Sequence, residues 1–226
     1  MGALLYGFLN FGVAFMFVYR ALTEITAGTM MVILATVPLL TSILAVAERL
    51  ERFSVRRTAG TITAVVGIAF VFGDSIGSAS PIALLAAVAG AAAMATAPVV
   101  VKKFPRVHAV VENALGMTVG GGVLLGLSFL FAEPQAMPTT AWTDFSLAYL
   151  IVLGSIGVFL LYVFVLRRMT ATGASYIMLL APLAAVGLGA LLLGEPLRPI
   201  FLIGGVLVLA GVCIGVTDQG TTSATP

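Results

Sequence analysis

The charged residues of this chain are confined to short stretches between long apolar ones. Only 20 of the 226 residues are charged, and 19 of these 20 lie outside eight apolar stretches. The stretches are 3–19, 25–47, 58–73, 81–101, 109–132, 145–166, 169–194 and 199–217. About 20 mostly apolar residues cross a bilayer as a helix, and a charge at its centre costs about 3 kcal/mol. The pattern predicts an all-α polytopic membrane protein with eight transmembrane helices in the lipid bilayer.

The composition excludes several other classes. Charged residues make up 9% of the chain, against about 25% in soluble domains. A net charge of +2 supplies no basic face for nucleic acid. One His and one Cys do not make a metal site, and no segment suggests a cofactor.

The basic residues predict the orientation in the membrane. Nine of the 11 Lys and Arg residues fall on one side of the predicted spans, and only Arg20 and Arg198 fall on the other. The nine are Arg49, Arg52, Arg56, Arg57, Lys102, Lys103, Arg106, Arg167 and Arg168. Because cytoplasmic loops carry the excess of basic residues, we expect a multi-pass protein of the plasma membrane with both termini in the cytoplasm.

An internal repeat divides the chain. A shift of 144 residues superimposes several pairs of identical residues, and four of them are a proline, a glutamate and two glycines at the same spacing. The pairs are Pro38 and Pro182, Glu51 and Glu195, Gly60 and Gly204, and Gly67 and Gly211. Equivalent spans lie five apart in the chain, so the copies are inverted, as in many transporters. We expect a first, incomplete repeat of three helices at 1–74, a second of five helices at 81–217, and a polar cytoplasmic tail at 218–226. The register also predicts two further helices before Met1.

The residues from Thr26 to Gly67 resemble the EamA-type repeat of the drug/metabolite transporter superfamily, and so do those from Thr170 to Gly211. The sequence Leu193-Gly194-Glu195-Pro196-Leu197 is similar to the ending of that repeat. The resemblance implies ten helices in two inverted five-helix halves. This chain departs from it in lacking the first two helices and in having Arg49-Leu50-Glu51-Arg52 where the first half usually has Gly-Glu.

The candidate substrate cavity contains polar and aromatic side chains within the spans. Its members are Tyr6, Asn10, Pro38, Ser155, Phe159, Tyr162, Tyr176 and Pro182. A proline within a helix leaves one backbone carbonyl without its usual donor, and in lipid that carbonyl needs another partner. The prolines therefore indicate either bent helices that line a cavity or kinks that only improve packing. Asn10 could bind substrate or a neighbouring helix, and Ser155 could bond to its own helix.

Glu112 is the only charged residue inside a span. It could couple transport to protons, or it could form an ion pair near the cytoplasmic edge. Glu51 and Glu195 stand at helix starts, where a carboxylate is favoured, so they and the paired glycines Gly60, Gly67, Gly204 and Gly211 are expected to be structural. Glycines four apart permit close helix contacts, within the chain or in a homodimer.

These features favour a secondary transporter, an exporter of small metabolites, amino acids or amphipathic drugs by alternating access. The alternative is a membrane assembly subunit or an inactive fragment. An intramembrane enzyme is disfavoured, because Gly154-Ser155-Ile156-Gly157 has the wrong order for a rhomboid-like protease and the single His108 lies at a helix edge.

Overall fold

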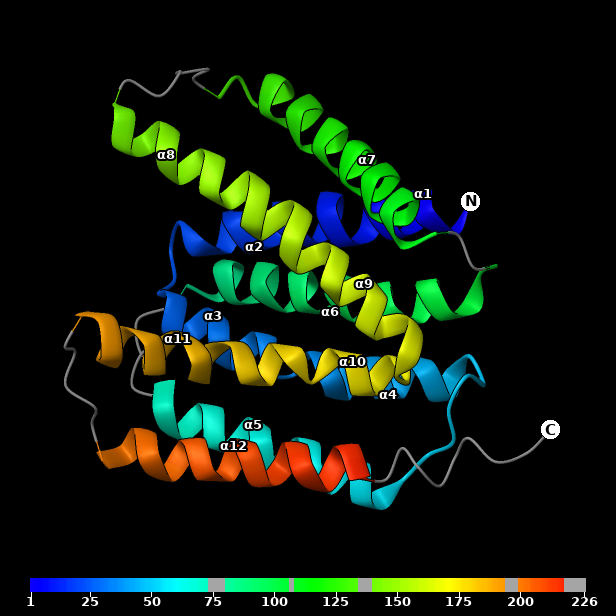
Figure 1. Cartoon of the computed structure of the whole chain (residues 1–226), viewed down its shortest axis with the longest axis vertical. Coiled ribbons are helices and arrows are strands. Elements are labelled where there is room, and N and C mark those ends of the chain that lie inside the picture. The colour runs from blue at the N-terminus through cyan, green and yellow to red at the C-terminus, as the bar shows by residue number, and fades with distance from the viewer. Residues whose placement is uncertain (73–79, 106–107, 134–139, 194–198, 218–226) are drawn as a thin grey trace.

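The computed structural model describes residues 1–72, 80–105, 108–133, 140–193 and 199–217, and every regular element within these ranges is helical (Figure 1). Glu195 and the predicted tail lie outside the described residues. The helices of the first 72 residues are α1 (Gly2–Gly7), η1 (Phe8–Val13), α2 (Ala14–Leu22), α3 (Ala27–Leu34), α4 (Val37–Ala47) and α5 (Val55–Phe72). Those that follow are α6 (Pro81–Lys103), α7 (Ala109–Leu130), α8 (Ala141–Tyr149), η3 (Leu150–Val158), α9 (Phe159–Arg168), α10 (Ala171–Ser175), α11 (Ile177–Leu193) and α12 (Pro199–Thr217).

Seven helical segments of the described chain are long and apolar enough to cross a membrane. They are Gly2–Leu22, Ala27–Ala47, Pro81–Lys103, Ala109–Leu130, Ala141–Arg168, Ala171–Leu188 and Pro199–Thr217. The 18-residue helix α5 packs along α12 and corresponds to the remaining predicted span. The all-α polytopic fold is therefore confirmed. The domain boundaries, and the two helices expected before Met1, stay predictions.

Equivalent helices of the two repeats begin in the same way. Thr26 and Thr170 stand 144 residues apart. Each has an extended backbone and directly precedes a helix. The hydroxyl of Thr26 accepts a hydrogen bond from the Thr29 amide (3.2 Å), and that of Thr170 accepts one from the Gly173 amide (3.0 Å). A threonine in this position satisfies an amide that the first helical turn leaves unbonded.

Within the described residues, two spans contain a π-helical segment, and these segments correspond. The span Gly2–Leu22 widens at η1, which contains Asn10, and the span Ala141–Arg168 widens at η3, which contains Ser155. Adding 144 to the residue numbers of η1 gives a range that lies within η3. Wide turns of this kind occur often at functional sites.

The two prolines affect their helices differently. The helix is interrupted at Ala35 and Thr36, so Pro38 lies in the first turn of α4, where a missing amide proton costs least. In the second repeat the interruption falls earlier, at Tyr176, and α11 continues through Pro182. The helix is thus interrupted just before Pro38, whereas Pro182 lies within one continuous helix.

Helices α5 and α12 pack antiparallel through four glycines, Gly60, Gly67, Gly204 and Gly211, which we call the glycine seam. A Cβ atom on Gly60 would lie 2.6 Å from the carbonyl oxygen of Gly211, and one on Gly67 would lie 2.6 Å from that of Gly204. Only glycine permits such a close backbone approach. Because Gly204 and Gly211 stand 144 residues after Gly60 and Gly67, the contact is reciprocal: each helix presents the same surface to the other.

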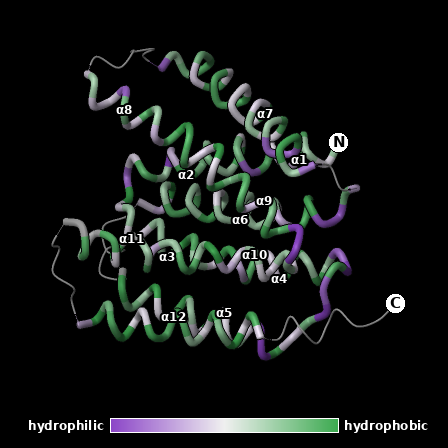
Figure 2. The backbone as a smooth tube through the Cα atoms, in the orientation of Figure 1, coloured by the Kyte–Doolittle hydropathy of each residue, from purple (hydrophilic) through white to green (hydrophobic). Residues whose placement is uncertain are grey.

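The bundle has two chemically different ends. We call the end with Arg49, Arg52, Arg56, Arg57, Lys102, Lys103, Arg167 and Arg168 the basic end, and the end with Arg20, Glu24, Ser80 and Glu133 the opposite end. Figure 2 shows polar residues at the helix ends and apolar residues between them. Toward the opposite end, α7 and α8 lean away from the other helices (Figure 1), and every residue of α8 is exposed.

Candidate functional site

A pocket of about 410 Å³ lies near the middle of the bundle, where five spans meet. We call it the central pocket. Its lining residues come from η1 and α2, α4, α6, η3 and α9, and the α10–α11 pair. They are Asn10, Phe15, Val37, Met94, Val158, Phe159, Leu161, Tyr162, Ser175, Ile177 and Met178. The pocket therefore draws side chains from both repeats and from their interrupted or widened helical segments.

The pocket wall is largely apolar and aromatic. Phe159 contacts Phe11 edge to face, with 4.9 Å between ring centroids, and it lies 6.4 Å from Phe15. The polar groups in the wall are the Asn10 amide and the hydroxyls of Tyr162 and Ser175; none of the lining residues is charged. The Ser175 hydroxyl donates to the carbonyl of Thr172 over 2.7 Å, so its lone pairs remain available to a ligand. An apolar pocket with a few polar groups suits a small organic molecule.

Three of the eight candidate cavity residues line the pocket: Asn10, Phe159 and Tyr162. Ser155 lies in η3 and Pro38 is buried next to the lining residue Val37, but neither contributes to the wall. Pro182 is likewise buried outside the wall, one helical turn from Met178.

Both remaining candidates, Tyr6 and Tyr176, are fully buried in helix interfaces instead. Tyr6 contacts Phe11 edge to face at 5.5 Å and faces Gly116 of α7. Tyr176 packs against Gly215, and its hydroxyl lies 2.9 Å from that of Thr61. Tyr176 therefore connects α5 with the second repeat.

Sequence patterns alone missed several wall residues, among them Val37, Met94, Ser175 and Met178. Met94 gave a weak signal, because it is a long side chain within an alanine-rich helix. Ser175 stands directly before the interruption at Tyr176. Each of these helices is apolar on all sides, so hydrophobic periodicity could not indicate which face lines a cavity.

A buried polar cluster joins the two repeats at the basic end. It comprises Glu51, Arg57 and Thr172, and we call it the Glu51 cluster. Glu51 accepts hydrogen bonds from the amide (3.0 Å) and the hydroxyl (2.7 Å) of Thr172, and it forms an ion pair with Arg57. The side chains of Glu51 and Arg57 are only 5% and 2% exposed. The carboxylate that follows α4 thus binds the start of α10 in the other repeat.

A second ion pair at the basic end connects α7 with α9. Arg167 donates to the carboxylate of Glu112 over 2.6 Å, and the Glu112 side chain is 5% exposed. Glu112 thus pairs with a residue 55 positions along the chain. Lys103 forms an exposed ion pair with Glu48.

The candidate metal ligands are few: the described residues contain no group of three His, Cys, Asp or Glu side chains that could hold a metal ion.

Comparison with known proteins gives consistent matches. The model of the EamA-like transporter family matches residues 1–73 and 81–217. The uncharacterized transporter YoaV of Bacillus subtilis (strain 168) is 26% identical over 219 residues, which cover 94% of this chain and 71% of the relative. A crystal structure titled only as that of a protein has the same fold, with a TM-score of 0.80, 18% identity, and coverage of 96% of this chain and 77% of that chain.

Proposed function

The chain belongs to the EamA-like transporter family, and from that premise we propose that it is a secondary transporter that exports small metabolites, amino acids or amphipathic drugs by alternating access. The observation that carries the proposal is the central pocket. It lies between the two repeats and receives side chains from η1, η3 and the interrupted helices. A site at the meeting point of inverted repeats can be exposed to each side of the membrane in turn.

The ends of the bundle support this mechanism, because the basic end is closed by bonds between the repeats. The Glu51 cluster joins α4 and α5 to α10, and the Thr61–Tyr176 contact joins α5 to the same region. Opening this end requires these buried bonds to break together. We propose that the basic end faces the cytoplasm of the cell and that the structure is closed on that side.

The chemistry of the wall indicates the kind of substrate. A net charge in a pocket lined only by uncharged groups would lose its hydration without gaining a partner. The aromatic and methionine side chains favour flat or flexible apolar groups. We therefore expect substrates without net charge, small enough for a volume of about 410 Å³ and able to hydrogen bond to Asn10, Tyr162 or Ser175.

Glu112 is the proposed coupling residue. It is buried and paired with Arg167 at the basic end, and protonation of the carboxylate would weaken that pair. A buried carboxylate whose partner is on another helix can link proton binding to a helix movement. Exchange of one substrate for another, without protons, is the competing mode of transport.

Flux measurements test the proposal. The purified chain would be reconstituted into vesicles, and uptake of radiolabelled neutral amino acids and an amphipathic dye would be followed with and without a pH gradient. Met94→Trp should fill the pocket and abolish saturable flux. Val88→Trp is the matched control, because Val88 lies on the same helix and is 51% exposed. Equal flux in the two variants would contradict the assignment of the pocket, and saturable flux in none of them would favour an assembly subunit.

A further inference from the structure

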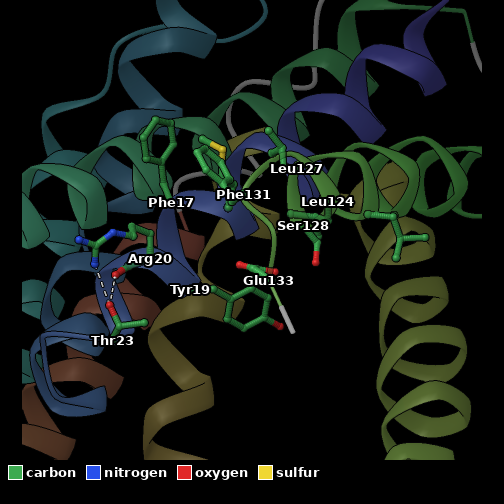
Figure 3. A pocket seen from close by; sticks show the side chains of 12 residues that line it. Phe17, Tyr19, Arg20, Thr23, Leu124, Leu127, Ser128, Phe131 and Glu133 are labelled. Atoms are coloured by element: carbon green, nitrogen blue, oxygen red, sulfur yellow. Dashed lines mark hydrogen bonds between the residues drawn. The ribbon is translucent and has the colours of Figure 1, made fainter. Parts of the chain in front are cut away.

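A second and larger cavity lies at the opposite end, between α2 and α7. Its volume is about 830 Å³, and Figure 3 shows the side chains that line it. We call it the lateral groove. It is lined by Met16, Phe17, Tyr19, Arg20, Thr23, Gly121, Leu124, Leu125, Leu127, Ser128, Phe131 and Glu133. These residues belong to two helices and to the short segments that follow them, and none of them lines the central pocket.

The groove exists because α7 diverges from the first span. Near its start α7 is close to that span: a Cβ atom on Gly116 would lie 2.9 Å from the ring of Tyr6, and one on Gly120 would lie 3.0 Å from the amide of Gly12. The contact continues to Val123, whose side chain lies 3.2 Å from where a Cβ atom on Gly12 would be, but α7 has little contact with α2 beyond it. A Cβ atom on Gly121 would have nothing within 4 Å. The two helices therefore form a wedge that widens toward the opposite end.

The walls of the wedge are suited to hydrocarbon. Leu124, Leu125 and Leu127 project from α7, and Met16 and Phe17 from α2. In a bilayer such a space is occupied by hydrocarbon, since an empty space would forfeit the dispersion contacts of its lining. The flexible side chains of Met16 and the leucines can adapt to an acyl chain.

The wide end of the groove carries charges of both signs. The Arg20 guanidinium donates to the Thr23 hydroxyl over 2.8 Å and lies 2.6 Å from the carboxylate of Glu24. A guanidinium has five N–H groups, so further donors remain for another acceptor. Glu133, which also lines the groove, contributes a carboxylate to the same end (Figure 3).

We propose that the lateral groove binds a phospholipid with a zwitterionic ammonium headgroup. The phosphate would accept hydrogen bonds from Arg20, the ammonium group would approach Glu133, and an acyl chain would lie between α2 and α7. Arg20 is the one cation among the residues that line the groove, and the carboxylates of Glu24 and Glu133 lie at the same end. This charge balance disfavours a lipid with a net negative charge.

Native mass spectrometry of the full chain in detergent micelles tests the proposal, with phosphatidylethanolamine and phosphatidylglycerol of identical acyl chains added in turn. The wild type should retain phosphatidylethanolamine preferentially. Gly121→Trp should fill the groove and reduce retention by about tenfold, a change of 1.4 kcal/mol. Gly122→Trp is the matched control, because Gly122 also has open space around it but does not line the groove. Glu133→Gln should shift the preference toward phosphatidylglycerol.

Equal retention in the Gly121 and Gly122 variants, or no headgroup preference in the wild type, would overturn the proposal. So would loss of a dimer, rather than of a lipid, in Gly121→Trp, since the groove would then hold a second copy of the chain. If the Gly121 variant does not fold, the site is tested instead by crosslinking the wild type to a phosphatidylethanolamine that carries a photoreactive acyl chain. Crosslinks within 121–131 of the wild type would support the site, and crosslinks only elsewhere would refute it. Lipid retention is independent of transport, so the outcome is read separately from flux.

Discussion

The two ends of the bundle are held in different ways. At the basic end, buried bonds cross between the repeats: Glu51 binds Thr172, and the Thr61 hydroxyl contacts that of Tyr176. At the opposite end, the polar contacts that Glu24 makes are exposed. Arg20 pairs with Glu24 four residues along the chain, and Ser80 donates to Glu24 over 2.5 Å. Among the described residues, the Glu51 cluster and the Thr61–Tyr176 contact therefore join the repeats by buried bonds at the basic end.

The repeat itself explains this difference. The positions equivalent to Thr172 and Arg57 are Gly28 and Phe201, and those equivalent to Thr61 and Tyr176 are Gly205 and Val32. The first repeat and α12 therefore lack the hydroxyls and the cation that close the basic end. An equivalent closure at the opposite end would have to form without these groups. We infer that the state closed at the basic end is the more stable of the two.

The largest effect is expected when the Glu51 cluster is broken. Glu51→Ala leaves Arg57 buried without its carboxylate, so we expect a loss of about 3–5 kcal/mol in the free energy of unfolding. The basic end should also open. With Cys213 replaced by Ser and Ser175 by Cys, an impermeant maleimide should label the pocket from the basic side about tenfold faster in the Glu51 variant.

Glu48→Ala is the matched control for Glu51→Ala. Glu48 lies three residues away and pairs with Lys103, but both side chains are largely exposed, at 42% and 52%. We expect it to change stability by less than about 1 kcal/mol and to leave labelling unchanged. Similar labelling rates in the two variants would show that the Glu51 cluster does not close the basic end.

Substitutions in the glycine seam should reduce stability by less than Glu51→Ala does. The loss should be similar at the two ends of the seam. Gly60→Ala and Gly67→Ala each place a Cβ atom 2.6 Å from a carbonyl oxygen, so each should cost about 1–3 kcal/mol through overpacking. Thermal unfolding in detergent measures the cost. Gly154→Ala is the control, because the nearest atom to its Cβ would be 3.9 Å away. A cost confined to one of the two seam positions would contradict the reciprocal contact.

Glu112→Gln should reduce stability by about 1–2 kcal/mol, because the hydrogen bond from Arg167 loses its charged acceptor. The loss stays moderate since Arg167 is 22% exposed and can be hydrated. If Glu112 couples transport to protons, the variant should lose flux driven by a pH gradient and keep substrate exchange. A variant that loses both kinds of flux equally would assign Glu112 a structural role.

The smallest effect concerns Glu24 at the opposite end. The hydrogen bond from Ser80, followed by that from Arg20, lowers the pKa of the Glu24 carboxyl below its usual value. A lowered pKa favours the folded state at neutral pH, and this contribution is lost as the pH falls from the usual carboxyl range through the lowered pKa. Ser80→Ala should raise the pKa of Glu24, measured by carbon NMR of the labelled side chain. An unchanged pKa would contradict the contact.

The sequence predicted the helices better than the pocket. Charges mark helix ends because charged groups are expensive in hydrocarbon, so the positions of the charges alone locate the spans. They do not indicate which face of each span lines a cavity. Ser155, Phe159 and Tyr162 share a face in a regular helix, but Ser155 lies in the wider η3, and only Phe159 and Tyr162 reach the pocket. Asn10 could be found because a single amide within an apolar span is conspicuous.

The sequence also could not predict the partners of the buried polar groups. Glu51 was expected to stabilise its own helix start, yet it binds Thr172, which is 121 residues away. In the second repeat the helix is interrupted at Tyr176, before Pro182, and the Tyr176 hydroxyl contacts Thr61. Such contacts depend on how the two repeats dock, and no local pattern records that arrangement.

The reciprocity of the glycine seam has one further consequence. If alternating access exchanges the roles of the two repeats, the contacts of Gly60 with Gly211 become those of Gly204 with Gly67, and the seam is transformed into itself. Its free energy is then the same in both conformers and cancels from the difference between them. The ratio of the two populations therefore depends on the positions at which the repeats differ. Each difference of about 1.4 kcal/mol in the free energy of the two conformers changes that ratio tenfold.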